Sequence, residues 1–143
     1  MRVDFYQLSR DPAEMVLPLI ARNTLAAGER LLVVSEDEAQ LTRIGEALWT
    51  RLPETFLANG KAGGPHDARQ PILLSHEVVP ANGAQFVALA DGGWRESEAA
   101  RVFLLFPPER IDAARDTWRL LGKREGVERK YWRQDGAKWR EGP

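Results

Sequence analysis

Runs of apolar residues along the chain predict the strands of a β-sheet. The segments Arg30–Val34 and Val102–Phe106 are almost entirely aliphatic or aromatic, which is typical of strands covered on both faces. Shorter apolar or alternating segments at Arg2–Leu8, Gln70–Ser75 and Gln85–Ala90 predict three further strands. We therefore expect a sheet whose central strands lie between layers of other structure.

Three segments have the three- and four-residue spacing of amphipathic helices. The first is expected to begin at Asp11 as cap, with Pro12 in its first turn, and to end at Gly28. The second is expected to be capped by Ser35, with Glu38 completing a capping box. The apolar stripe of the second helix consists of Leu41, Ile44 and Leu48, and that of the third consists of Ile111, Ala114, Trp118 and Leu121.

The remaining segments predict a loop and two hairpins. Leu57–Arg69 is rich in small and polar residues and has no periodicity, so it is expected to be a loop. The turn residues Pro80–Gly83 are expected to join their flanking strands as a hairpin. The alternating segment Val127–Arg133, the turn pair Asp135–Gly136 and Trp139 predict a hairpin at the edge of the sheet.

The order of these elements defines the fold class. Strand–helix–strand units at the start of the chain favour right-handed crossovers, and the hairpins make the sheet mixed. Residues 1–143 are expected to form a single-domain three-layer α/β/α fold with a mixed, partly parallel sheet, Rossmann-like without a nucleotide-binding fingerprint.

Composition and charge narrow the classes of function. The chain has 143 residues, no cysteine and a net charge of −1, which argues against binding to nucleic acid through the overall field. The positive charge is concentrated at the end, where Glu109–Pro143 holds ten basic residues against seven acidic ones. No leader and no apolar run of membrane-spanning length is visible, so the protein is expected to be soluble and cytoplasmic, with no membrane partner.

The sequence contains no recognisable catalytic, nucleotide-binding or metal-binding motif. Ser9–Pro12 and Ser35–Glu38 follow the first two strands, and neither has the glycines of a phosphate-binding loop. His66 and His76 lack metal-ligand spacing, and no serine lies in a nucleophile elbow. We expect a protein that is not an enzyme and that has no cofactor or metal. A small α/β nucleotide-binding domain or enzyme with no recognisable motif remains the alternative.

Aromatic and basic residues are the remaining candidates for function. Trp49 and Phe56 follow the second helix, while Trp118 lies between Arg115 and Arg119 on the third. The segment Lys130-Tyr131-Trp132-Arg133 near the end of the chain is the last of these candidates. Arginine and tryptophan are enriched at binding hot spots, and the mixture suits an acidic ligand with an apolar anchor. The residues leave open whether Trp118 and Phe56 belong to the core or to a site.

The chain resembles a known family, the chi subunit of bacterial DNA polymerase III. The resemblance extends over the whole chain and depends on the order and spacing of several motifs. They are Phe5-Tyr6-x-Leu8, the strand and acidic cap Leu31–Glu38, Ala47-Leu48-Trp49-Thr50 followed by Phe56, Gln70-Pro71-Ile72-Leu73-Leu74, Arg115-Asp116-x-Trp118-Arg119, Gly126, Tyr131-Trp132-Arg133-Gln134 and Gly136-x-x-Trp139.

The resemblance implies an accessory role in DNA replication. Chi-like proteins bind the psi subunit, which joins them to the clamp loader, and the acidic C-terminal tail of single-stranded DNA-binding protein, which ends in phenylalanine. DNA is then contacted only indirectly. We expect Arg115 and Arg119 to bind the acids of the tail, and Trp49, Phe56 and Trp118 to line one slot for its ring. The sequence does not place the psi surface, for which an exposed apolar patch away from Trp49 is the first candidate.

Overall fold

The computed structural model describes residues 1–143, and contains every helix and strand expected from the sequence together with one additional strand. In chain order the elements are β1 (Arg2–Gln7), α1 (Ala13–Ala26), β2 (Leu31–Val34), α2 (Glu38–Thr50), β3 (Asn59–Lys61), β4 (Ile72–Ser75), β5 (Phe86–Leu89), β6 (Arg101–Phe106), α3 (Ile111–Gly122), β7 (Glu128–Asp135) and β8 (Lys138–Glu141). Two short 3-10 helices, η1 (Asp67–Arg69) and η2 (Pro108–Arg110), lie between them.

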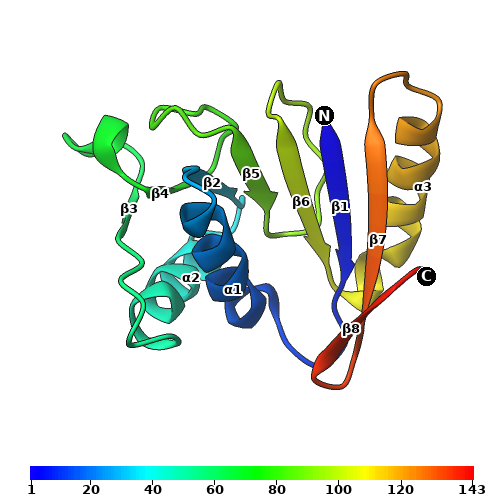
Figure 1. The fold of residues 1–143 in the computed structure, drawn as a ribbon, viewed down its shortest axis with the longest axis horizontal. Helices are drawn as coiled ribbons and strands as arrows, with labels where there is room; N and C mark the ends of the chain where they lie inside the picture. The colour runs from blue at the N-terminus through cyan, green and yellow to red at the C-terminus, as the bar shows by residue number, and fades with distance from the viewer.

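One eight-stranded sheet organises the molecule, in the order β3-β4-β2-β5-β6-β1-β7-β8 (Figure 1). All neighbouring strands are parallel except β7 and β8, which form the predicted antiparallel hairpin at the edge. Gly136 in its turn has a φ of 60°, a conformation that glycine adopts without strain. The sheet is therefore mixed and largely parallel, which confirms the predicted fold class.

Alternate residues of the central strands belong to two different cores. In β2, Leu31 and Val33 pack with α1 and α2, whereas Leu32 and Val34 pack into the core that contains α3. This arrangement explains why the strand is apolar at every position. α1 and α2 therefore cover one face of the sheet, and α3 covers β1 and β7 on the other face (Figure 1).

The predicted hairpin between β4 and β5 is wrong. Both strands lie parallel to β2, one on each side of it, so the segment that joins them crosses the end of β2. The buried side chain of Asn82 holds this crossing, since its amide donates to the carbonyl oxygens of Leu31 (3.2 Å) and Gln70 (3.0 Å). Turn residues indicate where a chain bends, but they do not determine which strands pair.

The segment Leu57–Arg69 is not entirely a loop, because it contains β3 and η1. β3 is only three residues long and pairs in parallel with β4 at the edge of the sheet. A strand this short carries no detectable alternation, so it is recognised only once its partner strand is in place.

Neither Ser35 nor Asp11 caps its helix as predicted. Asp37 caps α2, and its carboxylate accepts from the amides of Ala39 (2.9 Å) and Gln40 (3.3 Å), while Ser35 supports the approach by accepting from the Asp37 amide. α1 has Pro12 at its cap position and no side-chain cap. None of the three α-helices combines the length and the apolar character that crossing a membrane requires.

The segment before α1 is fixed by the C-terminal hairpin instead of by a cap box. The buried side chain of Gln134 accepts from the amides of Ser9, Arg10 and Asp11 at 3.0–3.1 Å. Its own amide donates to the Asp11 carboxylate (2.8 Å). Asp11 is thus oriented toward the hairpin and not toward the helix that it was predicted to cap.

Candidate protein-binding surfaces

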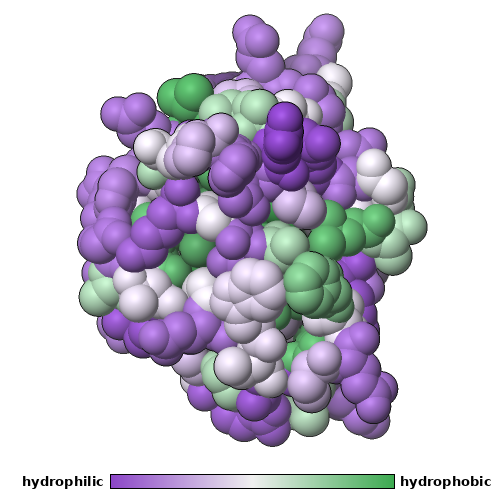
Figure 2. Space-filling model, turned by 90° about the vertical axis from the view of Figure 1, so that its left-hand side faces the viewer, coloured by the Kyte–Doolittle hydropathy of each residue, from purple (hydrophilic) through white to green (hydrophobic).

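Trp49 and Phe56 form an exposed pair, which we call the aromatic patch. Leu41, Ile44 and Leu48 direct one face of α2 into the core, so the next residue, Trp49, points outward. The side chains of Trp49 and Phe56 are 50% and 80% exposed, and their rings meet edge to face with centroids 5.5 Å apart. The face of the molecule that includes α2 and β3 carries pale and green residues at its centre, surrounded largely by hydrophilic ones (Figure 2).

Arg115, Trp118 and Arg119 lie together on α3, and we call them the basic α3 face. Their spacing of three and four residues places them on one side of the helix. The ring of Trp118 is half-buried, with centroids 5.2 Å from Phe5 and 5.7 Å from Tyr131. Trp118 is therefore part of the core at its inner edge, and only its outer edge is available to a ligand.

Arg129 is a member of this region that the sequence reasoning missed. Its guanidinium lies 4.1 Å from the centroid of the Trp118 ring and donates to the Trp118 carbonyl oxygen at 2.7 Å. This cation–π contact holds the indole in place. The alternation along the segment that forms β7 was the available signal, because it puts Arg129 on the same side as Tyr131.

The two arginines of the basic α3 face differ in their partners. Arg115 forms no ion pair, and it lies close enough to Tyr131 that its charge opposes the rise in the pKa of that phenol, which burial causes. Arg119 pairs with Asp116 at 2.6 Å, and both side chains are well exposed. An exposed pair of this kind contributes little stability and can be exchanged for an incoming carboxylate.

The structure does not bring the five candidate residues together, because the aromatic patch and the basic α3 face lie on opposite faces of the sheet. They also lie toward opposite ends of it, as the positions of α2 and α3 show (Figure 1). The connection from β1 to β2 and the connection from β6 to β7 run in opposite directions along the sheet. Right-handed crossovers in opposite directions place their helices on opposite faces.

The largest surface cavity, of about 560 Å³, lies where ligands of doubly wound folds usually bind, beyond the carboxyl ends of the strands. Its charged lining consists of Glu14, Glu36, Asp37 and Asp91 with Arg43 and Arg110. Arg43 already pairs with Glu14 at 3.1 Å. The excess of carboxylates repels phosphate, so this cavity gives no support to the nucleotide-binding alternative.

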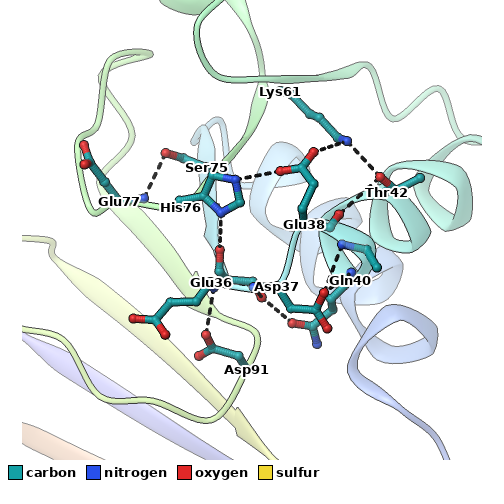
Figure 3. Close-up of polar contacts among 12 residues, drawn as sticks. Glu36, Asp37, Glu38, Gln40, Thr42, Lys61, Ser75, His76, Glu77 and Asp91 are labelled. Carbon is teal, nitrogen blue, oxygen red and sulfur yellow. Dashed lines mark hydrogen bonds and ion pairs between the residues drawn. The ribbon is translucent and has the colours of Figure 1, made fainter.

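Polar side chains near this cavity serve to join loops (Figure 3). Burial alone would raise the pKa of Asp91, but hydrogen bonds from Arg95 and from the amides of Glu36 and Gly93 outweigh it and lower the pKa to about 2. Glu38 bridges Lys61 and the imidazole of His76, whose hydrogen bonds lower the pKa of its carboxyl group.

The fold and the two surfaces define the class of this protein: an α/β domain that exposes one aromatic and one basic surface of the kind that binds other proteins. The family model described as DNA polymerase III chi subunit, HolC, matches residues 1–129, so the chain belongs to this family. A curated relative, the DNA polymerase III subunit chi of Escherichia coli (strain K12), is 38% identical over 69 residues. That match covers 43% of this chain and 47% of the relative, so the chain spans about half the length of the relative.

Proposed function

We propose that the chain is a non-catalytic accessory subunit of the DNA polymerase III holoenzyme in the bacterial cytoplasm. In DNA replication it links the clamp-loader complex, through the psi subunit, to the acidic C-terminal tail of single-stranded DNA-binding protein. The observation that carries this proposal is the presence of two exposed surfaces of contrasting chemistry on opposite faces of one sheet. Each partner then has its own surface, and DNA is reached only through the tail-bearing protein.

The basic α3 face is the surface for the acidic tail. A terminal carboxylate and the aspartates before it need cations, and Arg115 is an exposed arginine without an ion pair. Arg119 becomes a second donor when it releases Asp116. The outer edge of Trp118, steadied by Arg129, offers an apolar contact for the terminal phenylalanine ring.

The aromatic patch is the surface for psi. Trp49 and Phe56 are the exposed aromatic pair of the molecule, and they lie too far around the sheet to share a ligand with Arg115. Exposed aromatic side chains that contact each other are typical anchors for a partner that contributes apolar residues. We therefore assign Trp49 and Phe56 to psi instead of to the tail.

Reciprocal variants test the two assignments. Peptides that end in several aspartates and a phenylalanine are titrated against Arg115→Ala and Trp49→Ala, and capture of psi is measured with the same two variants. Losing a charge-assisted hydrogen bond corresponds to about a tenfold or greater loss of affinity, so Arg115→Ala should lose tail binding and retain psi. Trp49→Ala should do the opposite, and bare single-stranded oligonucleotide should bind poorly to every form.

Two results would contradict the proposal. Equal loss of tail binding in both variants would mean that one surface serves both partners. Tight binding of bare oligonucleotide by the wild-type chain would replace the adaptor role with direct DNA binding. Tail binding should also weaken with added salt, because exposed ion pairs are screened beyond about 8 Å at physiological ionic strength.

A further inference from the structure

The hairpin of β7 and β8 carries a second group of cations next to the basic α3 face. Residues alternate along β7, so Arg133 points to the same side of the sheet as Tyr131, which packs in the core containing α3. The pairing of β8 with β7 places Arg140 opposite Arg133, and Lys138 opposite Asp135. Arg133, Lys138 and Arg140 therefore share this side, and we call them the hairpin shelf.

The hairpin shelf has free positive charge. Arg133 and Lys138 are exposed and form no ion pair, whereas Arg140 pairs with Asp135. Arg115 on α3 lies close enough to Tyr131 on β7 for its charge to oppose the rise in the pKa of that phenol. Arg133 is two residues further along β7, so the hairpin shelf continues directly from the basic α3 face. Cations therefore lie on two sides of one region, on the helix and on the hairpin.

This geometry fits an extended acidic segment better than the helix alone does. Successive side chains of an extended peptide point to opposite sides, so a row of aspartates needs cations on both sides. Arg115 and Arg119 are on one helix face, separated by a rise of about 6 Å, and can serve only one side of such a peptide. The shelf provides the second side.

We infer that the hairpin shelf binds the aspartates that precede the terminal residue of the acidic tail, while the basic α3 face binds the terminal carboxylate. The inference rests on the proposed function, because it assigns further residues to the same ligand. Arg133, Lys138 and Arg140 lie beyond residue 129, where the match to the family model ends, so the assignment depends on this chain's own hairpin.

Two labelled peptides test the inference with the full chain by fluorescence anisotropy. One carries several aspartates before a terminal phenylalanine, and in the other every aspartate is replaced by asparagine. The double variant Arg133→Ala/Lys138→Ala should bind the aspartate peptide about fivefold to twentyfold more weakly than the wild type, as expected for two exposed charge pairs. It should bind the asparagine peptide as the wild type does, whereas Arg115→Ala should weaken binding of both.

The matched control is Arg22→Ala, which removes an exposed, unpaired arginine from α1 on the opposite face of the sheet. If the double variant binds the aspartate peptide as tightly as this control, the shelf inference is wrong and the proposed function stands. If the wild-type chain binds neither peptide, the proposed function itself fails. If the double variant loses binding of single-stranded oligonucleotide but retains the peptide, the shelf is a nucleic-acid contact and the inference is overturned.

Discussion

Replacing Asp91 with asparagine should destabilise the fold by an amount that depends on pH. Asp91 follows β5, and its carboxylate accepts from Arg95 at 2.7 and 2.8 Å and from the amides of Glu36 (2.9 Å) and Gly93 (3.0 Å). These contacts join the loops that leave β2 and β5. Asparagine keeps the shape and one acceptor oxygen, but it removes the charge that these donors stabilise.

The magnitude follows from the pKa of the carboxyl group. A decrease from the ordinary value of 3.8 to about 2 corresponds to roughly 2 kcal/mol of folding free energy. The Asp91 and Arg95 side chains are 19% and 21% exposed, so screening by water reduces the expected cost of Asp91→Asn to about 1–2 kcal/mol at neutral pH.

The sign of the pH dependence is fixed by the direction of the shift. The folded-state pKa is below the unfolded one, so the stabilisation is complete above about pH 4 and is lost as the pH falls toward 2. The difference in unfolding free energy between wild type and Asp91→Asn should therefore be constant at neutral pH and roughly halved by about pH 3.

Urea unfolding followed by tryptophan fluorescence over a series of pH values measures this difference. Glu46→Gln is the matched control, because Glu46 is an exposed carboxylate on α2 whose side chain has no ion pair. A difference between wild type and Asp91→Asn that grows as the pH falls, or that is no larger than the control's at neutral pH, would refute the reasoning.

Two further predictions concern polar side chains of β1 and β7. Burial, together with the charge of Asp4, raises the pKa of Tyr6 to about 12, so an absorbance titration should find this phenol largely protonated at pH 10, and ionisation of both tyrosines there would contradict its burial. Burial also raises the pKa of Tyr131, against the opposing charge of Arg115, so neither phenol should titrate below the ordinary range of tyrosine. The fully buried carboxylate of Asp4 accepts from Arg2, Arg101 (2.8 Å) and Trp132 (3.2 Å). Asp4→Ala should cost about 2–3 kcal/mol in urea unfolding, less than for a fully buried pair because both arginines reach water, and an unchanged stability would contradict it.

Patterns of apolar residues were sufficient to predict the central strands and the three helices. Val102–Phe106 is a continuous apolar run because β6 is covered on both faces, and the same is true of β2. The placement of β4 and β5 on either side of β2 was not predictable. The turn residues Pro80–Gly83 are compatible both with a hairpin and with a connection that crosses the end of β2. That choice depends on Asn82, whose amide reaches two carbonyl groups that are distant in the sequence.

The five candidate side chains are exposed or partly exposed in the structure, but their grouping was not predictable from their chemistry. By their chemistry alone, Trp49 and Arg115 could contact the same acidic peptide, and only the strand order shows that they are on different faces of the sheet. In the order β2-β5-β6-β1-β7, the crossover from β6 to β7 that contains α3 runs in the opposite direction to the crossover from β1 to β2. The helices of the two crossovers therefore lie on opposite faces. Arg133 was named in the sequence with Tyr131 and Trp132, but its side of the strand is defined only by its pairing with β1 and β8.

The separation of the two surfaces has a consequence for how an adaptor can work. Trp49 and Phe56 are divided from Arg115 by a sheet whose central strands are buried on both faces, so a proposed partner on one surface would leave the other surface open. The sheet lies in close-packed cores on both sides and resists deformation, so binding on one face gives little reason for the other to change. In the proposed role, a rigid domain of this kind would hold two partners at once, and their connection would need no conformational switch.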